Sequence, residues 1–279
     1  MNEVTPTATY KEEVAQYTKK DALHALLFVA YLALLLTAFN VLANAVNLDG
    51  LAWQLSFVGM GLFLVILPTF VIVKKKGQKF GSLGFHLLGW KRALGAGLLI
   101  AAVILMVLNG ILPGLLAGWQ MHTGMMLIWI IVYWLIRVFM EDIAIIGYLQ
   151  TRIYGLVKND VLAVLVVAFI FAALHYPTTF LTSDGFGPAF WGTLIILTFA
   201  WMLAHIMMNM FFRWYRSIIP VTLYHLAWNL SNGGQLWADR GDEGLDFVIS
   251  SLIVIFAALS ICLFLPSLKK FLKKRDTAK

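Results

Sequence analysis

The chain has 279 residues, of which 61% are hydrophobic and only 13% are charged. A soluble domain carries about 25% charged residues, so the composition excludes an ordinary soluble protein and predicts an all-α, polytopic membrane protein. The single cysteine, Cys262, excludes a disulfide within the chain and a cysteine metal cluster. The net charge of +7 does not indicate nucleic-acid binding, because the basic residues flank apolar segments, where contact with anionic lipid is the better explanation.

The apolar segments predict a bundle of about eight membrane-spanning helices. The first twenty residues are polar and the apolar run after them is long, so a cleaved signal peptide is not expected. A helix needs about 20 apolar residues to cross a bilayer. By this measure the predicted spans are 23–46, 51–73, 93–117, 124–147, 161–176, 190–212, 217–231 and 246–265. The fifth and seventh are short, which indicates helices buried in the bundle or a thinned bilayer. We expect one integral-membrane domain over residues 1–279.

The distribution of basic residues predicts the orientation. An even number of spans places both termini on one side, and all of the 21 Lys and Arg residues except Arg137 and Arg240 fall on that side. The positive-inside rule therefore predicts cytoplasmic termini. Residues 77–90 are expected to lie on the cytoplasmic membrane surface or to form a solvated loop. The basic tail at 268–275 is expected to be a membrane-surface anchor or a frayed end.

Two adjacent acids, Glu141 and Asp142, interrupt the fourth predicted span. A charged carboxylate at mid-membrane costs about 2.5–3.5 kcal/mol on insertion scales, so these residues indicate a functional site. They lie about 100° apart around a helix, and one can line a cavity while the other meets a neighbouring helix. Arg137 lies four residues before Glu141 on the same face, so an ion pair that only locks the bundle is the alternative interpretation.

Polar residues in later spans are candidate partners for these acids. His175 ends the fifth span, and His225 and Asn229 lie four residues apart on one helix face. A histidine at the membrane interface, or a polar pair that joins helices, would explain them without a function. The same spacing recurs at His205 and Asn209, so spacing alone is weak support. Counted at about 1.5 Å per residue, the candidates lie at different depths and meet only if the helices tilt.

Three short motifs resemble the CAAX-protease and bacteriocin-processing family of intramembrane proteases, also called CPBP or Abi. The family motif Glu-Glu-x-x-x-Arg, commonly followed by Gly, corresponds to the stretch that begins at Glu141. Phe-x-x-x-His matches Phe171 to His175, and His-x-x-x-Asn matches His225 to Asn229. The sequence at 217–220 also resembles the family, which favours His225 over the histidine at 205. The resemblance covers roughly residues 124–232.

Two positions depart from the family pattern. The second acid is Asp142, and Ile146 stands where the motif has arginine. In the pattern these positions are four apart on a helix and could form an ion pair. With both positions changed, we expect Asp142 to have lost its partner. The departure fits an impaired or specialised member of the family.

The resemblance implies an endopeptidase that cleaves a membrane-associated protein or peptide. Glu141 with His175 would activate a water, and His225 with Asn229 would donate hydrogen bonds to the developing oxyanion. Two histidines and a glutamate could also bind zinc. The histidines lie on separate helices and lack the His-Glu-x-x-His pattern, so we expect a mechanism without metal or other cofactor.

Two other functions remain as alternatives. A non-catalytic family member could act as a membrane scaffold or bacteriocin-immunity factor, which the replacement of the motif arginine by Ile146 favours. A transporter or proton relay could also use buried acids and histidines, but the two halves of the chain lack a repeated pair of broken helices. The protease is the preferred interpretation.

Overall fold

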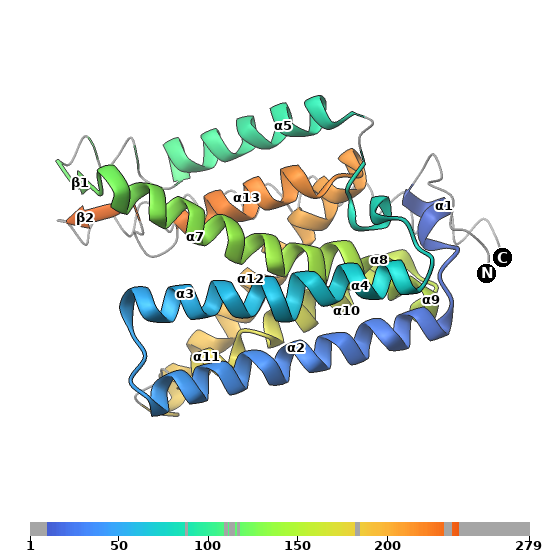
Figure 1. The fold of residues 1–279 in the computed structure, drawn as a ribbon, viewed down its shortest axis with the longest axis horizontal. Helices are drawn as coiled ribbons and strands as arrows, with labels where there is room; N and C mark the ends of the chain where they lie inside the picture. Colours follow the sequence, from blue (N-terminus) through green and yellow to red (C-terminus); the bar gives the residue numbers. More distant parts are fainter. Residues whose placement is uncertain are drawn as a thin grey trace.

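The structure, a computed structural model, describes residues 10–86, 89–108, 111, 115, 118–181, 185–231 and 236–239. This part of the chain is largely helical (Figure 1). Among these described residues, four helical segments are long and apolar enough to cross a membrane: Lys19–Ala45, Gly50–Lys75, Asp160–Leu181 and Phe190–Tyr215. The fold is therefore that of an all-α polytopic membrane protein, and eight crossings stay a prediction. The eighth predicted span, the basic tail and Cys262 lie outside the described residues.

The N-terminal part of the bundle consists of two long helical segments, residues 19–45 and 50–75, and a shorter one at residues 90–108. Helix α1 (Tyr10–Val14) precedes α2 (Lys19–Ala45), which begins with a capping box between Thr18 and Asp21. Helix α3 (Gly50–Gly61), the π-helical turn η1 (Leu62–Ile66) and α4 (Leu67–Lys75) follow one another without a break. Pro68 lacks an N–H donor, which explains the irregular turn before it. The 3₁₀ turn η2 (Phe80–Leu83) leads to α5 (Trp90–Val103) and the π-turn η3 (Ile104–Leu108).

The remaining elements carry all the candidate site residues. They are β1 (Gln120–Met121), α7 (Gly124–Asp142), the π-helix η4 (Ile143–Leu149), α8 (Gln150–Arg152), α9 (Tyr154–Val157), α10 (Asp160–Ala173), α11 (Tyr176–Leu181), α12 (Pro188–Tyr215), α13 (Ile218–Ser231) and β2 (Trp237–Asp239). Strands β1 and β2 pair antiparallel at one end of the bundle (Figure 1). Helix α10 begins where the side chain of Asn159 accepts a hydrogen bond from the backbone of Leu162.

Helix α13 lies in the middle of the bundle and packs against α5, α7 and α12 (Figure 1). Its residues Val221, Tyr224 and Ala227 are at most 1% exposed. The prediction that the short seventh segment is buried within the bundle is therefore confirmed. The fifth segment is longer than predicted and runs through α11 to Leu181. The continuation contains Pro177 as the second residue of α11, because proline is tolerated in the first turn of a helix.

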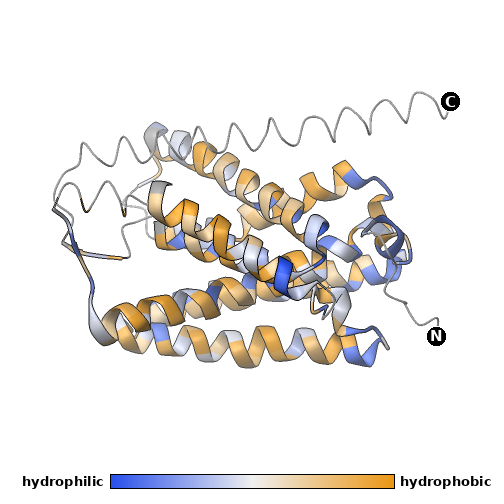
Figure 2. Ribbon diagram, turned by 90° about the horizontal axis from the view of Figure 1, so that it is seen from above, coloured by the Kyte–Doolittle hydropathy of each residue, from blue (hydrophilic) through white to orange (hydrophobic). Residues whose placement is uncertain are grey.

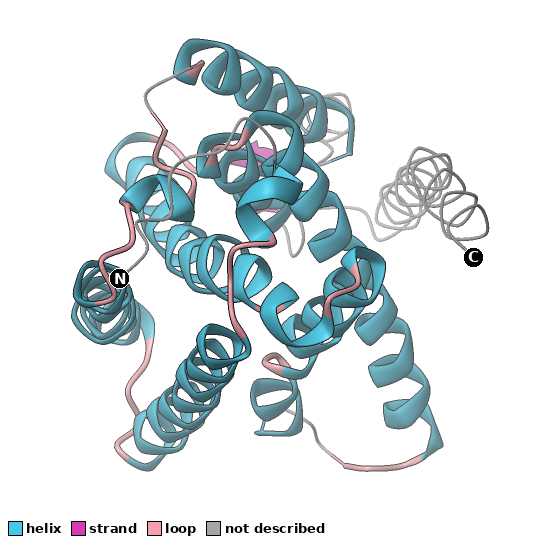
Figure 3. Cartoon of the chain, turned by 90° about the vertical axis from the view of Figure 1, so that its right-hand side faces the viewer, coloured by secondary structure: helices cyan, strands magenta, loops and turns pink. Residues whose placement is uncertain are grey.

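The two ends of the bundle differ in polarity. Figure 2 shows long hydrophobic helices with hydrophilic residues gathered toward the end that carries α1, and Figure 3 views the bundle from that end. The C-terminal ends of α4 and α9 lie there together with α1 (Figure 1). Lys74 and Lys75 are the last residues of α4, Lys158 directly follows α9, and Arg216 directly follows α12. This common placement is what the orientation prediction requires.

The segment at 77–90, as far as the structure describes it, is packed rather than solvated. Leu83 is fully buried, while Phe80 and Trp90 are 44% and 43% exposed. Turn η2 contacts η4, and the backbone N–H of Ile218 donates to the carbonyl of Gly84. The expected solvated loop is therefore wrong for this part, and its exposed aromatic rings fit the alternative of contact with the membrane surface.

Candidate active site

Glu141 and Asp142 are the last two residues of α7, and η4 begins directly after them. A π-helical turn shifts the helical repeat and is frequent at functional sites. All seven residues of η4 are buried. A Cβ atom at Gly147 would lie 2.9 Å from the carbonyl oxygen of Leu83. Glycine at this position is therefore what allows η2 to approach the helix that carries the acids.

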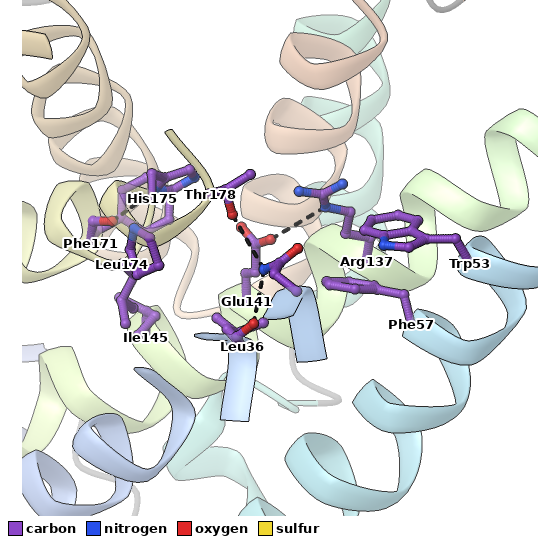
Figure 4. A pocket seen from close by; sticks show the side chains of 12 residues that line it. Leu36, Trp53, Phe57, Arg137, Glu141, Ile145, Phe171, Leu174, His175 and Thr178 are labelled. Carbon is purple, nitrogen blue, oxygen red and sulfur yellow. Dashed lines mark hydrogen bonds and ion pairs between the residues drawn. The ribbon is translucent and has the colours of Figure 1, made fainter. Parts of the chain in front are cut away.

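A cavity of about 140 Å³ opens beside Glu141 (Figure 4). This volume accommodates several water molecules, because each needs about 10–15 Å³ by this measure. The wall comes from α2, α3, α7, η4, α10 and α11, and it is formed by Leu36, Asn40, Trp53, Phe57, Arg137, Glu141, Ile145, Phe171, Leu174, His175, Pro177 and Thr178. Glu141 also borders a smaller cavity, whose other lining residues are apolar.

The two carboxylate oxygens of Glu141 face two different cationic or potentially cationic groups. Oε1 lies 3.6 Å from Nε of Arg137, and Oε2 lies 3.9 Å from Nε2 of His225. The guanidinium of Arg137 lies 4.7 Å from the ring centre of Trp134, and its Nη1 donates to the hydroxyl of Tyr133. The predicted pair of Arg137 and Glu141 is thus present, and aromatic side chains hold its cation in place.

Asp142 points away from the cavity toward α13. It is 1% exposed, and its Oδ1 accepts a hydrogen bond of 2.9 Å from Nδ1 of His225. The hydroxyl of Thr222, one turn earlier on α13, lies beside the same carboxyl. The expectation that Asp142 lacks a partner is therefore wrong. The partner comes from a helix 83 residues later, which a comparison within one motif does not reveal.

His175 lies at the junction of α10 and α11 and reaches the same cavity as Glu141 (Figure 4). Its Nδ1 donates to the carbonyl of Phe171 at 2.9 Å, and its ring stacks on Trp201 with centres 4.6 Å apart. A carbonyl only accepts hydrogen bonds, so Nδ1 carries the proton and Nε2 of the neutral ring is left as an acceptor.

His225 and Asn229 are not among the described residues that line the cavity. Nδ2 of Asn229 donates to the backbone carbonyl of His225 at 3.1 Å. The structure therefore brings His225 to both acids, whereas Asn229 is bonded within its own helix.

The aromatic ring of Phe171 lies among three histidines. Its centre is 4.9 Å from that of His175, 5.5 Å from that of His205 and 6.0 Å from that of His225. The histidine at 205, whose spacing to Asn209 repeats that of the motif, is thus close to the site but is not among the described residues that line the cavity. The matched motif residue Phe171 does line it.

Sequence reasoning missed several wall residues. Nδ2 of Asn40 donates to the carbonyl of Leu36 at 2.8 Å and to the hydroxyl of Thr178 at 3.4 Å. Asn40 could have been noticed as an amide inside the first apolar run. Trp201, which stacks on His175, had no signal, because tryptophan in an apolar helix is ordinary.

The arrangement of donors bears on the zinc alternative. Within the described parts of the chain, no three side chains of His, Cys, Asp or Glu lie so that they could hold a metal ion together. Nδ1 of His175 and Nδ1 of His225 bond to Phe171 and to Asp142, which leaves Nε2 of each ring as the nitrogen that a metal would use. A mechanism without metal therefore stays a prediction.

Comparison with known families supports the interpretation of these residues. The family described as Type II CAAX prenyl endopeptidase Rce1-like matches residues 123–231, which include all three motifs. No curated protein and no solved structure gave a match. The resemblance predicted from the motifs is thus confirmed over residues 123–231.

Proposed function

We propose that this protein is an intramembrane endopeptidase that cleaves a membrane-associated protein or peptide with a water activated by Glu141 and His175. The observation that carries the proposal is the cavity that these two side chains share. Glu141 reaches it from the end of α7, and His175 reaches it from just after the end of α10. The match to the CAAX-protease family supports the same reaction class.

The chemistry follows from the hydrogen-bonding capacity of the two side chains. The carboxylate of Glu141 accepts hydrogen bonds, and so does Nε2 of His175, because Nδ1 donates to Phe171. A water between them would donate one hydrogen to each and keep a lone pair free for the scissile carbonyl. Transfer of a proton to such a base contributes about 10²–10⁴-fold to a rate.

Arg137 and His225 have supporting parts in this mechanism. Arg137 lines the cavity and provides positive charge where the tetrahedral intermediate would form, a kind of contact worth about 2.7–4 kcal/mol. His225, held by Asp142, positions Glu141 through its other ring nitrogen. Asn229 would stabilise the turn of α13 that carries His225. This differs from direct donation to the oxyanion by His225 and Asn229, because neither is among the described residues that line the cavity.

The surroundings of the cavity indicate the kind of substrate. Its walls include Leu36, Trp53 and Phe57, and the smaller cavity that Glu141 also borders is otherwise lined by apolar residues. Apolar side chains next to the scissile bond would fit these surfaces. With cytoplasmic termini, the basic end of the bundle would contact anionic lipid.

The test is cleavage of membrane-associated peptides by the protein in proteoliposomes, read by mass spectrometry. The panel contains prenylated CAAX peptides and unprenylated leader peptides. We expect wild-type cleavage, a loss of about 10²-fold or more with Glu141→Gln, and no change with Asp49→Asn, an exposed acid between α2 and α3.

Folding of each variant is checked by its thermal unfolding midpoint. Glu141→Gln keeps the shape of the side chain, so its midpoint can be compared directly with that of the wild type. Full cleavage by this variant would remove Glu141 from the mechanism. The wild-type protein could instead bind a peptide without cleaving it. If the double variant Glu141→Gln with His175→Ala bound that peptide equally well, the non-catalytic alternative would be established.

A further inference from the structure

Asn40 lies on α2 and brings an amide into the wall of the cavity that Glu141 and His175 share. It lies outside the matched residues 123–231, so the family comparison gives it no part, and the proposed mechanism does not use it. Helix α2 is one of the segments apolar enough to cross a membrane. An amide in such a helix costs free energy unless its polar atoms have partners, so the partners of its two ends are informative.

The nitrogen of the Asn40 amide is held by two acceptors. Nδ2 donates to the backbone carbonyl of Leu36 at 2.8 Å, one turn earlier on α2, and to the hydroxyl oxygen of Thr178 on α11 at 3.4 Å. A backbone carbonyl only accepts hydrogen bonds, so the amide atom that faces Leu36 is the nitrogen. The two bonds orient the amide without using its oxygen. In the part of the chain that the structure describes, no protein group donates to Oδ1 of Asn40.

A peptide in the cavity needs both donors and acceptors from the wall, because its backbone N–H and C=O groups both require partners away from water. Arg137 supplies donors on the side of the scissile carbonyl. In the proposed mechanism the hydrolytic water occupies the acceptors of Glu141 and His175. The hydroxyl oxygen of Thr178 already accepts from Asn40. Among the wall residues that the structure describes, Oδ1 of Asn40 is therefore the acceptor left for the substrate backbone.

We propose that Asn40 binds the substrate backbone, with Oδ1 accepting a hydrogen bond from a peptide N–H next to the scissile bond. Because it names a contact of the substrate, this inference rests on the proposed function. The contact selects for backbone conformation and not for a side chain. In a helical substrate each N–H is already bonded to the carbonyl four residues earlier, so Asn40 would recognise a segment that is extended at the site of cleavage.

The test measures peptide binding by the Glu141→Gln variant, so it does not require cleavage. The probes are one prenylated CAAX peptide and one unprenylated leader peptide, each made as a series in which an ester oxygen replaces one backbone N–H at a time. We expect one ester near the scissile bond to weaken binding about 2- to 10-fold, as for the loss of a neutral hydrogen bond. Adding Asn40→Leu should abolish the effect of that ester and of no other.

Thr37→Val in α2 is the matched control. The hydroxyl of Thr37 donates to the carbonyl of Ala33 at 2.8 Å, as Asn40 does one turn later, but Thr37 is not among the described residues that line the cavity. This substitution should leave every ester effect unchanged. Asn40→Thr is the second variant, for use if Asn40→Leu does not fold. Its hydroxyl can bond to the carbonyl four residues earlier but is shorter than the amide, so it too should abolish the ester effect.

The contact and the proposed function can fail separately. Ester effects that are the same with and without Asn40→Leu at every position would overturn the contact, even where the wild-type protein cleaves the peptide. The expected coupling without wild-type cleavage would keep the contact and overturn the proposed reaction. With cleavage, Asn40→Leu should raise KM about 2- to 10-fold at nearly constant kcat, because the bond is present in the ground state and the transition state alike. A lower kcat at constant KM would overturn this role.

Discussion

Nδ1 of His225 lies 2.9 Å from Oδ1 of Asp142, the acid at which this chain departs from its family motif. The contact shows that the shortened acid is not left alone in the membrane interior, because α13 supplies the group that balances it. The other ring nitrogen of His225 faces Glu141 at 3.9 Å. Asp142 therefore orients the imidazole that lies beside the proposed base, as the third group does in a catalytic triad.

Asp142→Asn tests this orientation. The variant keeps the shape of the side chain but no longer stabilises a charged imidazole. We expect kcat/KM for peptide cleavage to fall about 10- to 100-fold, less than the roughly 10⁴-fold that the equivalent change costs a Ser-His-Asp triad, because His225 acts through Glu141. Asp142→Glu keeps the charge and should instead lower stability, since the site has no room for another methylene group. A wild-type kcat/KM for Asp142→Asn would show that the pair of Asp142 and His225 is purely structural.

Arg137→Gln removes one of the two groups that flank the Glu141 carboxylate. We expect a loss of about 10²-fold in kcat/KM, because positive charge at the cavity is removed. Arg137→Lys keeps the charge but loses the planar contact with Trp134, so an intermediate rate is expected. Equal rates for both variants and wild type would exclude a part for Arg137 in the reaction. Unfolding midpoints are measured on the same variants. They distinguish a loss of catalytic activity from a loss of folding.

Gly147→Ala tests the close contact between η4 and η2. The new Cβ would meet the backbone of Leu83 at 2.9 Å, which cannot rotate away. We expect a destabilisation of about 1–3 kcal/mol, as for other overpacked sites. Gly59→Ala is the matched control, because a Cβ there meets nothing within 4 Å inside α3. That control should stabilise by about 0.5–1 kcal/mol, since alanine favours a helix. Thermal unfolding in detergent measures the stability of both variants. Similar changes in unfolding free energy for the two would contradict a close contact between η4 and η2.

Arg152 should be the cation on which folding depends most. It is fully buried between the rings of Tyr17 and Tyr148, and it donates to Ser82, Gly147 and Gln78. Arg152→Met leaves these acceptors without a donor, so we expect a loss of about 3 kcal/mol or more in unfolding free energy.

Arg92→Met, at an exposed position of α5, is the matched control for Arg152→Met. It should shift the unfolding midpoint little. Cleavage activity of the folded fraction should be unchanged by either substitution, because neither residue lines the cavity.

Metal removal separates the two possible ways of activating water. In the mechanism proposed above, prolonged dialysis against a zinc chelator leaves the cleavage rate unchanged, because carboxylate and imidazole act directly. Loss of activity that returns with added zinc would assign Glu141 and His175 as metal ligands instead. The Glu141→Gln variant, treated in the same way, serves as the inactive reference.

The sequence predicted an all-α membrane protein because only helices and closed barrels satisfy the backbone in a bilayer, while four of the eight expected spans are found among the described residues. The fifth span was expected to end at residue 176, whereas the helical segment continues through α11 to Leu181. The motifs brought Glu141 and His175 to notice, and the structure places both in one cavity. The sequence could not predict contacts between helices that are distant in the chain. The hydrogen bond from His225 to Asp142, for example, depends on how α13 packs against α7.

Phe171 illustrates a difficulty for experiments that rank residues by activity alone. Its ring touches three imidazoles and has nothing to donate or accept. Truncating it to alanine would enlarge the cavity and remove the ring that packs against all three imidazoles, so an activity scan would rank Phe171 with the proposed base. Only graded replacements, such as Phe171→Leu beside Phe171→Tyr, distinguish a side chain that packs between reactive groups from one that reacts.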